Sequence, residues 1–389
     1  MTAPARAAVC VLAIASAVLI TACGSTAPTA ENSPAAWAAP AGAGLLDTST
    51  DTAAGTWATV VMGGSVASHN NFWQLFMRPP GSQRWKLVTP PGVADTGGLV
   101  LAAAGPSLVT GFRPSQGLTY TPLTQTRDGG QTWSSTGPLD APLANVPDAL
   151  AAAPGNGNLL ALQADGTASV AAPGYTRWAT LASPRSLAAT PVGQRCGVSS
   201  INAATYTPAG QPLLAATCSR PGTVGIFADS SGAWQAAAPV IPAALATPPV
   251  YVVRLTTTAS QTMALLTAGT GHTARLLAAW SADNGQHWTL SPPLSLSGAA
   301  LASAAFGPAG TVAVITTGGT AAVISSAGAW QRLPALPAGT ATLAPGLTGQ
   351  ADALAVHRGT LTIWKLSADG SAWTKTQVIS VPIQYGSSS

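Results

Sequence analysis

Carboxylates are the first residues of this sequence to consider for chemistry. The chain has 389 residues with 12 Asp and Glu against 16 Lys and Arg, and its single glutamate is Glu31, close to the N-terminus. Hydrolysis of a glycosidic bond needs two opposed carboxylates. Nothing in the sequence places two of the remaining aspartates together. Five aspartates belong neither to the N-terminal segment nor to the turn motif described below: Asp95, Asp140, Asp148, Asp165 and Asp352.

Arginine and histidine gather in short segments rich in glycine and proline. If several of these cations surround one binding site, they would favour an anionic ligand, such as a carboxylated sugar or a phosphorylated envelope polymer. The alternative is that loops simply collect polar residues. The residues concerned are His69, Arg113, Arg220, His272, His357 and Arg358.

Several other chemistries are not expected. Lysine occurs only as Lys86, Lys365 and Lys375, and the net charge is +4, which argues against a nucleic-acid groove. The chain has no HExxH sequence, no glycine-rich phosphate loop and no Ser–His–Asp order with supporting turn residues. We therefore expect neither a metal ion nor a cofactor.

Composition indicates the kind of element that must position these residues. Hydrophobic residues make up 47% of the chain and charged residues only 7%, with 41 Gly and 32 Pro. Helical bundles need more Glu and Lys on their surfaces, and disordered chains need more charge and fewer apolar residues. A turn-rich, all-β protein is the class that remains.

The first 22 residues have the features of a short export signal. Arg6 supplies a positive start, and residues 9–20 form an apolar stretch too short for a membrane span, which needs about 20 residues. The sequence Ile20-Thr21-Ala22-Cys23 resembles a bacterial lipobox, in which the cysteine carries a diacylglycerol and begins the mature chain. The alternative is an ordinary signal peptide that contains a cysteine. The resemblance implies a lipoprotein held at the cell membrane, on its extracytoplasmic side.

Residues 23–50 are small, polar and proline-rich, as expected of a flexible tether. Residues 51–389 are then expected to form a single domain. The heavy use of Ala, Pro and Gly is typical of a high-GC actinobacterium.

Two cysteines remain for this domain, Cys196 and Cys218. An exported domain with two leftover thiols most often joins them. Metal binding is the weaker alternative, because two thiols without a nearby histidine provide too few ligands. We predict a disulfide, which could contribute about 3 kcal/mol.

Tryptophan spacing shows that the domain is a repeat. Each tryptophan of the series comes after a segment of alternating polar and apolar residues and a turn, and it begins another short strand-like segment. Two more strand-like segments come before these. Each repeat therefore has four short strands in about 48 residues, which is typical of a propeller blade. The domain holds about seven such units, so we predict a seven-bladed β-propeller of four-stranded antiparallel blades rather than six or eight blades. The series has a mean spacing of 48 residues: Trp85, Trp133, Trp178, Trp234, Trp288, Trp330 and Trp373.

Two turns of the repeat carry a known pattern. TRDGGQTW (126–133) and SADNGQHW (281–288) resemble the Asp-box, Ser/Thr-x-Asp-x-Gly-x-Thr-Trp, with His287 replacing the usual Thr in the second. Degenerate copies occur at Asp229/Trp234, at Ser367/Asp369/Trp373 and at Ser325/Gly328/Trp330. The domain is therefore similar to the sialidase-like, or BNR, propeller superfamily. This resemblance indicates the fold but does not indicate one function.

The residues of the box have structural uses. The aspartate can accept backbone N–H groups within the turn, the glycine supplies a positive φ, and the tryptophan covers the hairpin. We expect these roles for Asp128, Gly130, Trp133, Asp283, Gly285 and Trp288.

The resemblance implies that a ligand binds on the face opposite the boxes. The turns with His69, Arg113, Arg220, His272 and Arg358 fall on that face by the repeat register, as do the interblade loops with Asp95, Asp140 and Asp148. Arg254, on an apparent innermost strand (residues 251–258), is a further candidate for the channel wall; alternatively it extends to the surface.

Sialidases of this superfamily bind the substrate carboxylate with three arginines and use an Asp acid/base with a Tyr nucleophile activated by Glu. The domain contains no Glu, and residues 77–80 (MRPP) do not match the Phe/Tyr-Arg-Ile-Pro sequence that opens such enzymes. We therefore assign no catalytic residue and predict a non-catalytic, monomeric module that binds an anionic envelope glycan or a partner protein. The alternative is a divergent exo-glycosidase that uses two of Asp95, Asp140 and Asp148.

Ring closure is ambiguous in the sequence. The first unit starts at its second strand (residues 56–63), so another segment must supply the innermost one. We predict that residues 380–385 do so, which would protect two exposed edges. The alternative is residues 44–50.

Overall fold

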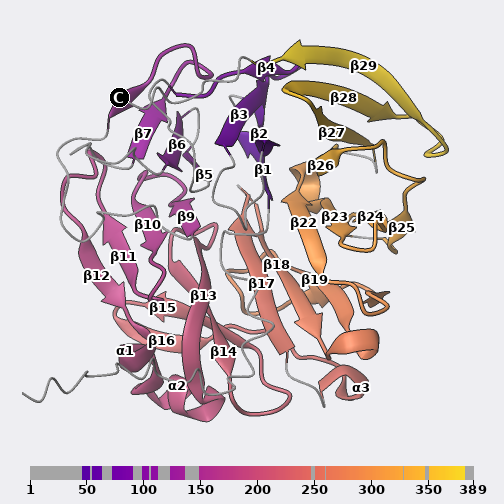
Figure 1. Ribbon diagram of the computed structural model, residues 1–389. Helices are drawn as coiled ribbons and strands as arrows, with labels where there is room; N and C mark the ends of the chain where they lie inside the picture. The colour runs from indigo at the N-terminus through magenta and orange to yellow at the C-terminus, as the bar shows by residue number, and fades with distance from the viewer. Residues whose placement is uncertain are drawn as a thin grey trace, which may run out of the picture. The chain divides into compact units, whose positions relative to one another are not determined.

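The computed structural model describes residues 46–52, 55–63, 72–90, 99–104, 107–112, 123–135, 149–246, 250–258, 260–326, 328–346 and 350–381. These residues form a seven-bladed β-propeller of four-stranded antiparallel blades, which confirms the predicted fold (Figure 1). Residues Trp37–Ser389 cluster as one compact unit that contains all seven blades.

Each blade follows the order of the chain from its innermost to its outermost strand. Blade one has β1 (Leu46–Thr52), β2 (Gly55–Gly63), β3 (Phe72–Arg78) and β4 (Lys86–Leu87), and blade two has β5 (Leu99–Ala104), β6 (Ser107–Phe112), β7 (Leu123–Thr126) and β8 (Ser134–Ser135). Blade three has β9 (Ala149–Ala152), β10 (Leu159–Leu162), β11 (Ala168–Ala171) and β12 (Ala179–Ala182). Blade four has β13 (Val198–Tyr206), β14 (Pro212–Cys218), β15 (Gly225–Ser230) and β16 (Ala233–Ala236).

The remaining three blades repeat the pattern. Blade five has β17 (Val250–Thr257), β18 (Thr262–Ala268), β19 (Arg275–Ser281) and β20 (Thr289–Leu290), with β21 (Leu294–Ser295) also pairing with β19. Blade six has β22 (Leu301–Phe306), β23 (Val312–Thr316), β24 (Ala321–Ile324) and β25 (Gln331–Arg332). Blade seven has β26 (Thr340–Pro345), β27 (Ala351–His357), β28 (Thr360–Leu366) and β29 (Trp373–Ser380).

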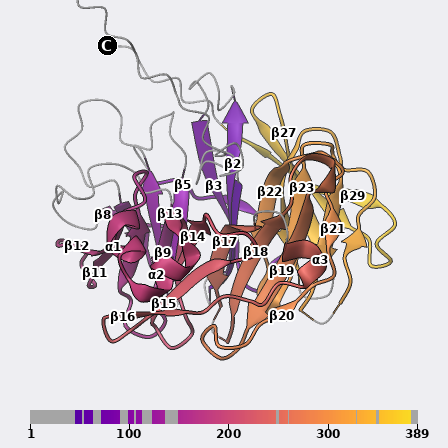
Figure 2. The same ribbon diagram turned by 90° about the horizontal axis from the view of Figure 1, so that it is seen from below.

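Short helices lie in the connections between blades. Helices α1 (Pro184–Ala188) and α2 (Pro191–Cys196) join blade three to blade four, and α3 (Ala243–Ala246) joins blade four to blade five (Figure 2). Two 3₁₀ turns, η4 (Gly271–Thr273) and η5 (Pro308–Gly310), lie within blades five and six.

The core lies between neighbouring blades. A central strand has a blade on each side, so apolar residues occupy both of its faces, and every residue of β18 is buried. Met263 and Leu265 of blade five pack with Phe306 and Val312 of blade six, for example. Several outermost strands are only two residues long, which limits the exposed edge of those blades.

The prediction that residues 380–385 supply the innermost strand of blade one was wrong. Strand β1, near the N-terminus, lies next to β2 in the sheet and is the innermost strand of blade one. It begins at Leu46, so the propeller includes the last residues of the segment 23–50 that we assigned to the tether. The chain from Trp373 to Ser380 instead completes blade seven, and residues 382–385 lie outside the described residues.

Strand β1 also pairs in parallel with β22, from Leu46 opposite Ser303 to Thr48 opposite Ala305. This pairing joins the sheets of blades one and six. The N-terminal strand therefore lies at the centre of the ring, where the innermost strands meet (Figure 1).

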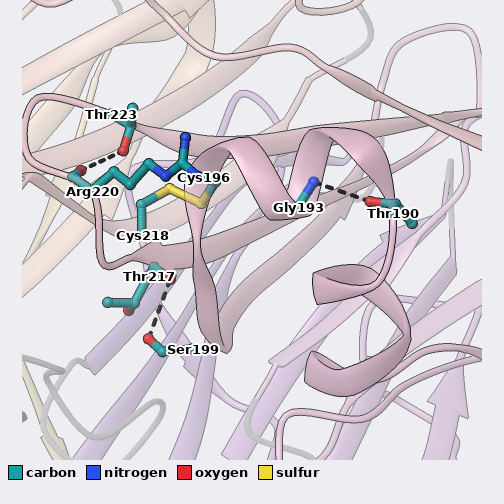
Figure 3. The surroundings of a disulfide bond; sticks show 8 residues. All are labelled: Thr190, Gly193, Cys196, Ser199, Thr217, Cys218, Arg220 and Thr223. Carbon is teal, nitrogen blue, oxygen red and sulfur yellow. Dashed lines mark hydrogen bonds between the residues drawn. A yellow bond between two sulfur atoms is a disulfide. The ribbon is translucent and has the colours of Figure 1, made fainter.

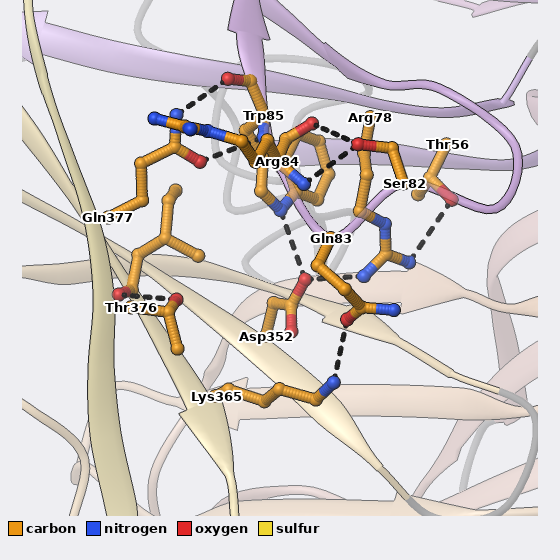
Figure 4. Close-up of polar contacts among 11 residues, drawn as sticks. Thr56, Arg78, Ser82, Gln83, Arg84, Trp85, Asp352, Lys365, Thr376 and Gln377 are labelled. Carbon is orange, nitrogen blue, oxygen red and sulfur yellow. Dashed lines mark hydrogen bonds and ion pairs between the residues drawn. The ribbon is translucent and has the colours of Figure 1, made fainter.

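Blades seven and one are joined by side chains (Figure 4). The guanidinium of Arg78 in β3 donates to Asp352 Oδ2 of β27 at 2.5 Å, and the indole Nε1 of Trp85 donates to the same oxygen at 3.0 Å. The Trp85 backbone exchanges two hydrogen bonds with the amide of Gln377 in β29, at 2.9 and 2.8 Å. Both charged side chains are largely buried, with relative exposures of 19% for Arg78 and 7% for Asp352.

Candidate functional site

The antiparallel order of each blade divides the turns between two faces. Turns between the first and second strands and between the third and fourth strands lie on one face, which carries the Asp-boxes and is called the box face here. Turns between the second and third strands, and the connections between blades, lie on the other face, called the loop face.

The first Asp-box is a closed hydrogen-bonded turn. Oδ1 of Asp128 accepts the hydroxyl of Thr126 at 2.8 Å and the backbone N–H groups of Gln131 and Thr132 at 3.0 and 2.9 Å. Its Oδ2 accepts the Thr132 hydroxyl at 2.5 Å. Hydrogen bonds from the side chain and then the backbone of Thr132 lower the pKa of Asp128 to about 2.

The second box has the same geometry with histidine in place of threonine. Asp283 accepts the Ser281 hydroxyl at 2.9 Å and the His287 backbone N–H at 2.8 Å, and His287 Nδ1 lies 2.5 Å from its other oxygen. These hydrogen bonds, the His287 backbone first, lower the pKa of Asp283 to about 2. The degenerate copy at Asp369 also has a pKa lowered to about 2, chiefly by the Ser367 hydroxyl.

Each box also contacts the preceding blade. The indole N–H of Trp133 donates to the Val88 carbonyl at 3.1 Å, and that of Trp288 donates to the Ala237 carbonyl at 2.8 Å. Gly130 has a φ of +83°, and a Cβ there would lie 2.6 Å from Val88 Cβ, so both the turn and the packing require glycine. The box residues therefore stabilise the junctions between blades.

Every aspartate whose side chain the structure describes has such a structural partner. Asp165 accepts the Thr167 N–H at 2.8 Å, Asp229 accepts the Gly232 N–H at 2.9 Å, and Asp352 is paired with Arg78. Together with the three box aspartates, these account for all six described side chains. Asp95, Asp140 and Asp148 lie outside the described residues, so the proposed carboxylate pair stays a prediction.

Arg220 lies on the loop face beside the disulfide (Figure 3). The predicted Cys196–Cys218 bond is confirmed, with the two Cα atoms 4.9 Å apart. The Arg220 backbone N–H donates to the Cys196 carbonyl at 3.2 Å, and its own carbonyl accepts the Thr223 N–H and hydroxyl. The turn after β14 is therefore attached to α2, with the Arg220 side chain exposed.

The other predicted cations of the loop face lie in separate turns. His272 is exposed in η4, next to Gly298, where an added Cβ would lie 2.9 Å from its ring. His357 and Arg358 are exposed in the tight turn between β27 and β28, and Arg358 has a φ of +44°, a left-handed conformation that is unusual for a long side chain. His69 and Arg113 lie outside the described residues.

Arg254 is partly buried on β17, directly after an irregularity between Val252 and Arg254 in the pairing with β18. This places it on an innermost strand, as predicted. On blade four, the residue within the corresponding irregularity, Asn202 between Ile201 and Ala203, is polar, and its amide donates to the Val252 carbonyl at 2.8 Å.

Two arginines of the loop face escaped the sequence analysis. Arg185 and Arg195 are exposed on α1 and α2. The sequence does contain signals for the start of each helix. Ser183 and Thr190 are N-cap residues, and each is followed by a proline at the first helical position. Helices of five and six residues are too short to show a periodic apolar pattern.

The described part of the chain contains no helix that is long and apolar enough to cross a membrane. Within the same residues, no three His, Cys, Asp or Glu side chains come together as a metal site.

Comparison with known proteins gives a fold but no family. No protein-family model and no curated protein matches the chain. Among solved structures, it is similar to a protein from Lactobacillus plantarum, with a TM-score of 0.51 and 13% identity over 84% of this chain and 96% of that one. YCF48 from Cyanidioschyzon merolae matches with a TM-score of 0.49 and 15% identity over 81% and 94% of the two chains. At these identities the likeness shows the β-propeller fold alone.

Proposed function

We propose that the chain is a membrane-anchored, extracytoplasmic propeller of the sialidase-like Asp-box type, whose loop face binds an anionic envelope glycan or a partner protein without catalysis. The observation that carries the proposal is that the described carboxylates are all engaged within the fold, whereas several cations of the loop face are exposed. All six described aspartates are hydrogen-bonded within turns or to Arg78, whereas Arg220, His272 and Arg358 are exposed on the loop face.

The Asp-box assignment is supported by the matched turns at Asp128 and Asp283, with their shared hydrogen bonds and low pKa values. The anchor rests on the resemblance of residues 20–23 to a lipobox. Its test is a Cys23→Ser variant in the native host, which should move the protein from the membrane fraction to the medium. Retention of that variant at the membrane would contradict a lipid anchor at Cys23.

Ligand binding is tested with the unit Trp37–Ser389 and a panel of acidic sugars, neutral glycans and envelope polymer fragments. A ligand at 100 times its Kd stabilises a protein by about 2.7 kcal/mol, which raises the thermal midpoint by several degrees. We expect a shift with anionic ligands only, and its loss in Arg358→Gln or Arg220→Gln.

The matched control is Arg127→Gln, because Arg127 is an exposed arginine of the box face. An equal loss in the control would point to non-specific charge. No shift with any compound would exclude the glycan and leave a protein partner.

The hydrolase alternative predicts turnover of a glycoside by the same protein. Turnover lost in one of Asp95→Asn, Asp140→Asn or Asp148→Asn, with an unchanged thermal midpoint, would replace the non-catalytic proposal.

A further inference from the structure

Three connections on the loop face lie beside one another at blade four. The first carries α1 and α2 and leads from β12 to β13; the second is the turn from β14 to β15; the third carries α3 and leads from β16 to β17. All three are opposite the box face, because each either follows a fourth strand or joins a second strand to a third.

Covalent and close backbone contacts hold these connections together. The disulfide joins α2 to the end of β14, and the Arg220 N–H donates to the Cys196 carbonyl at 3.2 Å (Figure 3). On the other side of the same turn, a Cβ added to Gly222 would lie 2.9 Å from the Ala246 carbonyl oxygen of α3. The connections therefore present a continuous surface rather than three independent loops.

This part of the propeller is strongly cationic. Residues 166–282 contain six arginines and one acidic residue, Asp229, which lies in a box-face turn. Arg185, Arg195 and Arg220 are exposed, and none of them forms an ion pair with a described carboxylate. Asp165 is an acidic residue close to this surface, because the turn that contains it packs against Pro184 at the start of α1.

The same surface has an exposed apolar segment. Val240 is 90% exposed, and Pro242, Ala243 and Ala244 beside it are exposed as well. Helix α3 buries none of its residues, and no charged residue occurs between Asp229 and Arg254. Contiguous exposed apolar segments, unlike single exposed residues, point to sites of association.

We infer that the surface formed by Arg185, Arg195, Arg220, Val240, Pro242 and Ala243 docks onto an anionic lipid bilayer. Arginines attract the phosphate headgroups, and short apolar segments beside them insert at the boundary between headgroups and acyl chains. A membrane fits better than an acidic protein because the exposed apolar segment is short and has no aromatic anchor, which a protein hot spot normally has.

The position of the N-terminal strand agrees with this partner. Strand β1 meets β2 at the box face, so its first residue, Leu46, lies at the loop face. The chain between Cys23 and Leu46 therefore joins the propeller on the same face as the docking surface. A lipid at Cys23 would keep that face within about 80 Å of the bilayer even with this chain fully extended.

The inference goes beyond the proposed function and does not depend on the lipid anchor or on a glycan. Its test uses the unit Trp37–Ser389, which holds all the described strands and lacks Cys23. Vesicles of equal parts phosphatidylglycerol and phosphatidylcholine are compared with vesicles of phosphatidylcholine alone, and bound protein is measured by flotation. We expect binding to the anionic vesicles only, weakening as salt is added.

Variants locate the binding surface. Each of Arg185→Gln, Arg195→Gln and Arg220→Gln should weaken vesicle binding about fivefold, and the triple variant about a hundredfold. Val240→Asp should weaken it about tenfold, whereas Asp165→Asn should strengthen it.

The matched control is the triple variant Arg84→Gln, Arg127→Gln, Arg177→Gln, which removes the same charge from exposed turns of the box face. It should retain binding within about twofold. Equal losses in the two triple variants would overturn the docking surface in favour of diffuse charge. Binding to polyglutamate but not to anionic vesicles would overturn it in favour of an acidic protein. Thermal shifts with glycans remain a separate test through Arg358→Gln, because Arg358 lies in the turn between β27 and β28 of blade seven, outside this surface.

Discussion

The junction that closes the ring differs from three junctions along the chain, although the tryptophan of the repeat is used at all four. Trp133, Trp288 and Trp330 donate their indole N–H to a backbone carbonyl just beyond the outermost strand of the preceding blade, at Val88, Ala237 and Pro292. Trp85 donates instead to the Asp352 carboxylate of blade seven.

The difference has a physical reason. A backbone carbonyl needs no further partner, but a buried carboxylate is stable only when its charge is compensated. Arg78 supplies that compensation, with its guanidinium carbon 5.4 Å from the centre of the Trp85 ring. Where no covalent connection joins two blades, the ring is closed by an ion pair and by the Gln377 amide rather than by a repeat of the ordinary contact.

The largest expected effect comes from breaking this closing junction. Asp352→Ala leaves Arg78 buried without its partner, so we expect a loss of about 3 to 5 kcal/mol in the free energy of unfolding. Denaturant unfolding of the unit Trp37–Ser389 measures it. Asp229→Ala, which removes a carboxylate from a partly exposed turn, should cost less than about 1 kcal/mol. Equal losses in the two variants would show that closure does not depend on the ion pair.

A covalent link within blade four provides the next test. Replacing Cys196 and Cys218 by serine should cost about 2 to 4 kcal/mol, because the bond closes a loop of 22 residues. The loss should be confined to the region of α2 and the turn after β14, with hydrogen exchange at the blade seven–blade one junction unchanged. Faster exchange of Trp85 in this variant would mean that the two regions are coupled.

Much of this architecture could be predicted from the sequence because it is local. The Trp repeat marks each fourth strand, so that Trp373 opens β29 and Trp133 directly precedes β8. The box turns at Asp128 and Asp283 also form from residues within eight positions of one another.

The closing junction could not be predicted, because its residues are far apart in the chain. Arg78 and Asp352 are separated by 274 residues, and neither belongs to a motif. The segments 44–50 and 380–385 both offered a short strand, and only the geometry of the whole ring distinguishes them. The cations of the loop face were found in part, since Arg185 and Arg195 lie on helices too short to predict from periodicity.

Tryptophan variants sharpen the contrast between the two kinds of junction. Trp85→Phe removes a donor from a buried carboxylate, so we expect a cost of about 2 to 3 kcal/mol from that hydrogen bond, since bonds to charged groups are the stronger ones. Trp288→Phe leaves two uncharged backbone carbonyls, those of Ala237 and Gly285, without the indole N–H and should cost about 1 kcal/mol. Chemical denaturation measures both, and a larger loss in Trp288→Phe would reverse the proposed difference.

The smallest expected effect is a loss of stability at acid pH that is caused by the aspartates of the Asp-boxes. Asp128, Asp283 and Asp369 have pKa values near 2 in the folded chain against 3.8 as ordinary aspartates. Because folding lowers these values, the stability that they contribute is complete above pH 3.8 and is lost as the pH falls towards 2. The thermal midpoint should therefore decrease between about pH 4 and pH 2, and less steeply in Asp128→Asn than in the unchanged chain. If the thermal midpoints of the two proteins depended on pH in the same way, the ionised carboxylate of Asp128 would contribute no stability through its hydrogen bonds. The boxes would then hold neighbouring blades together through tryptophan and glycine alone.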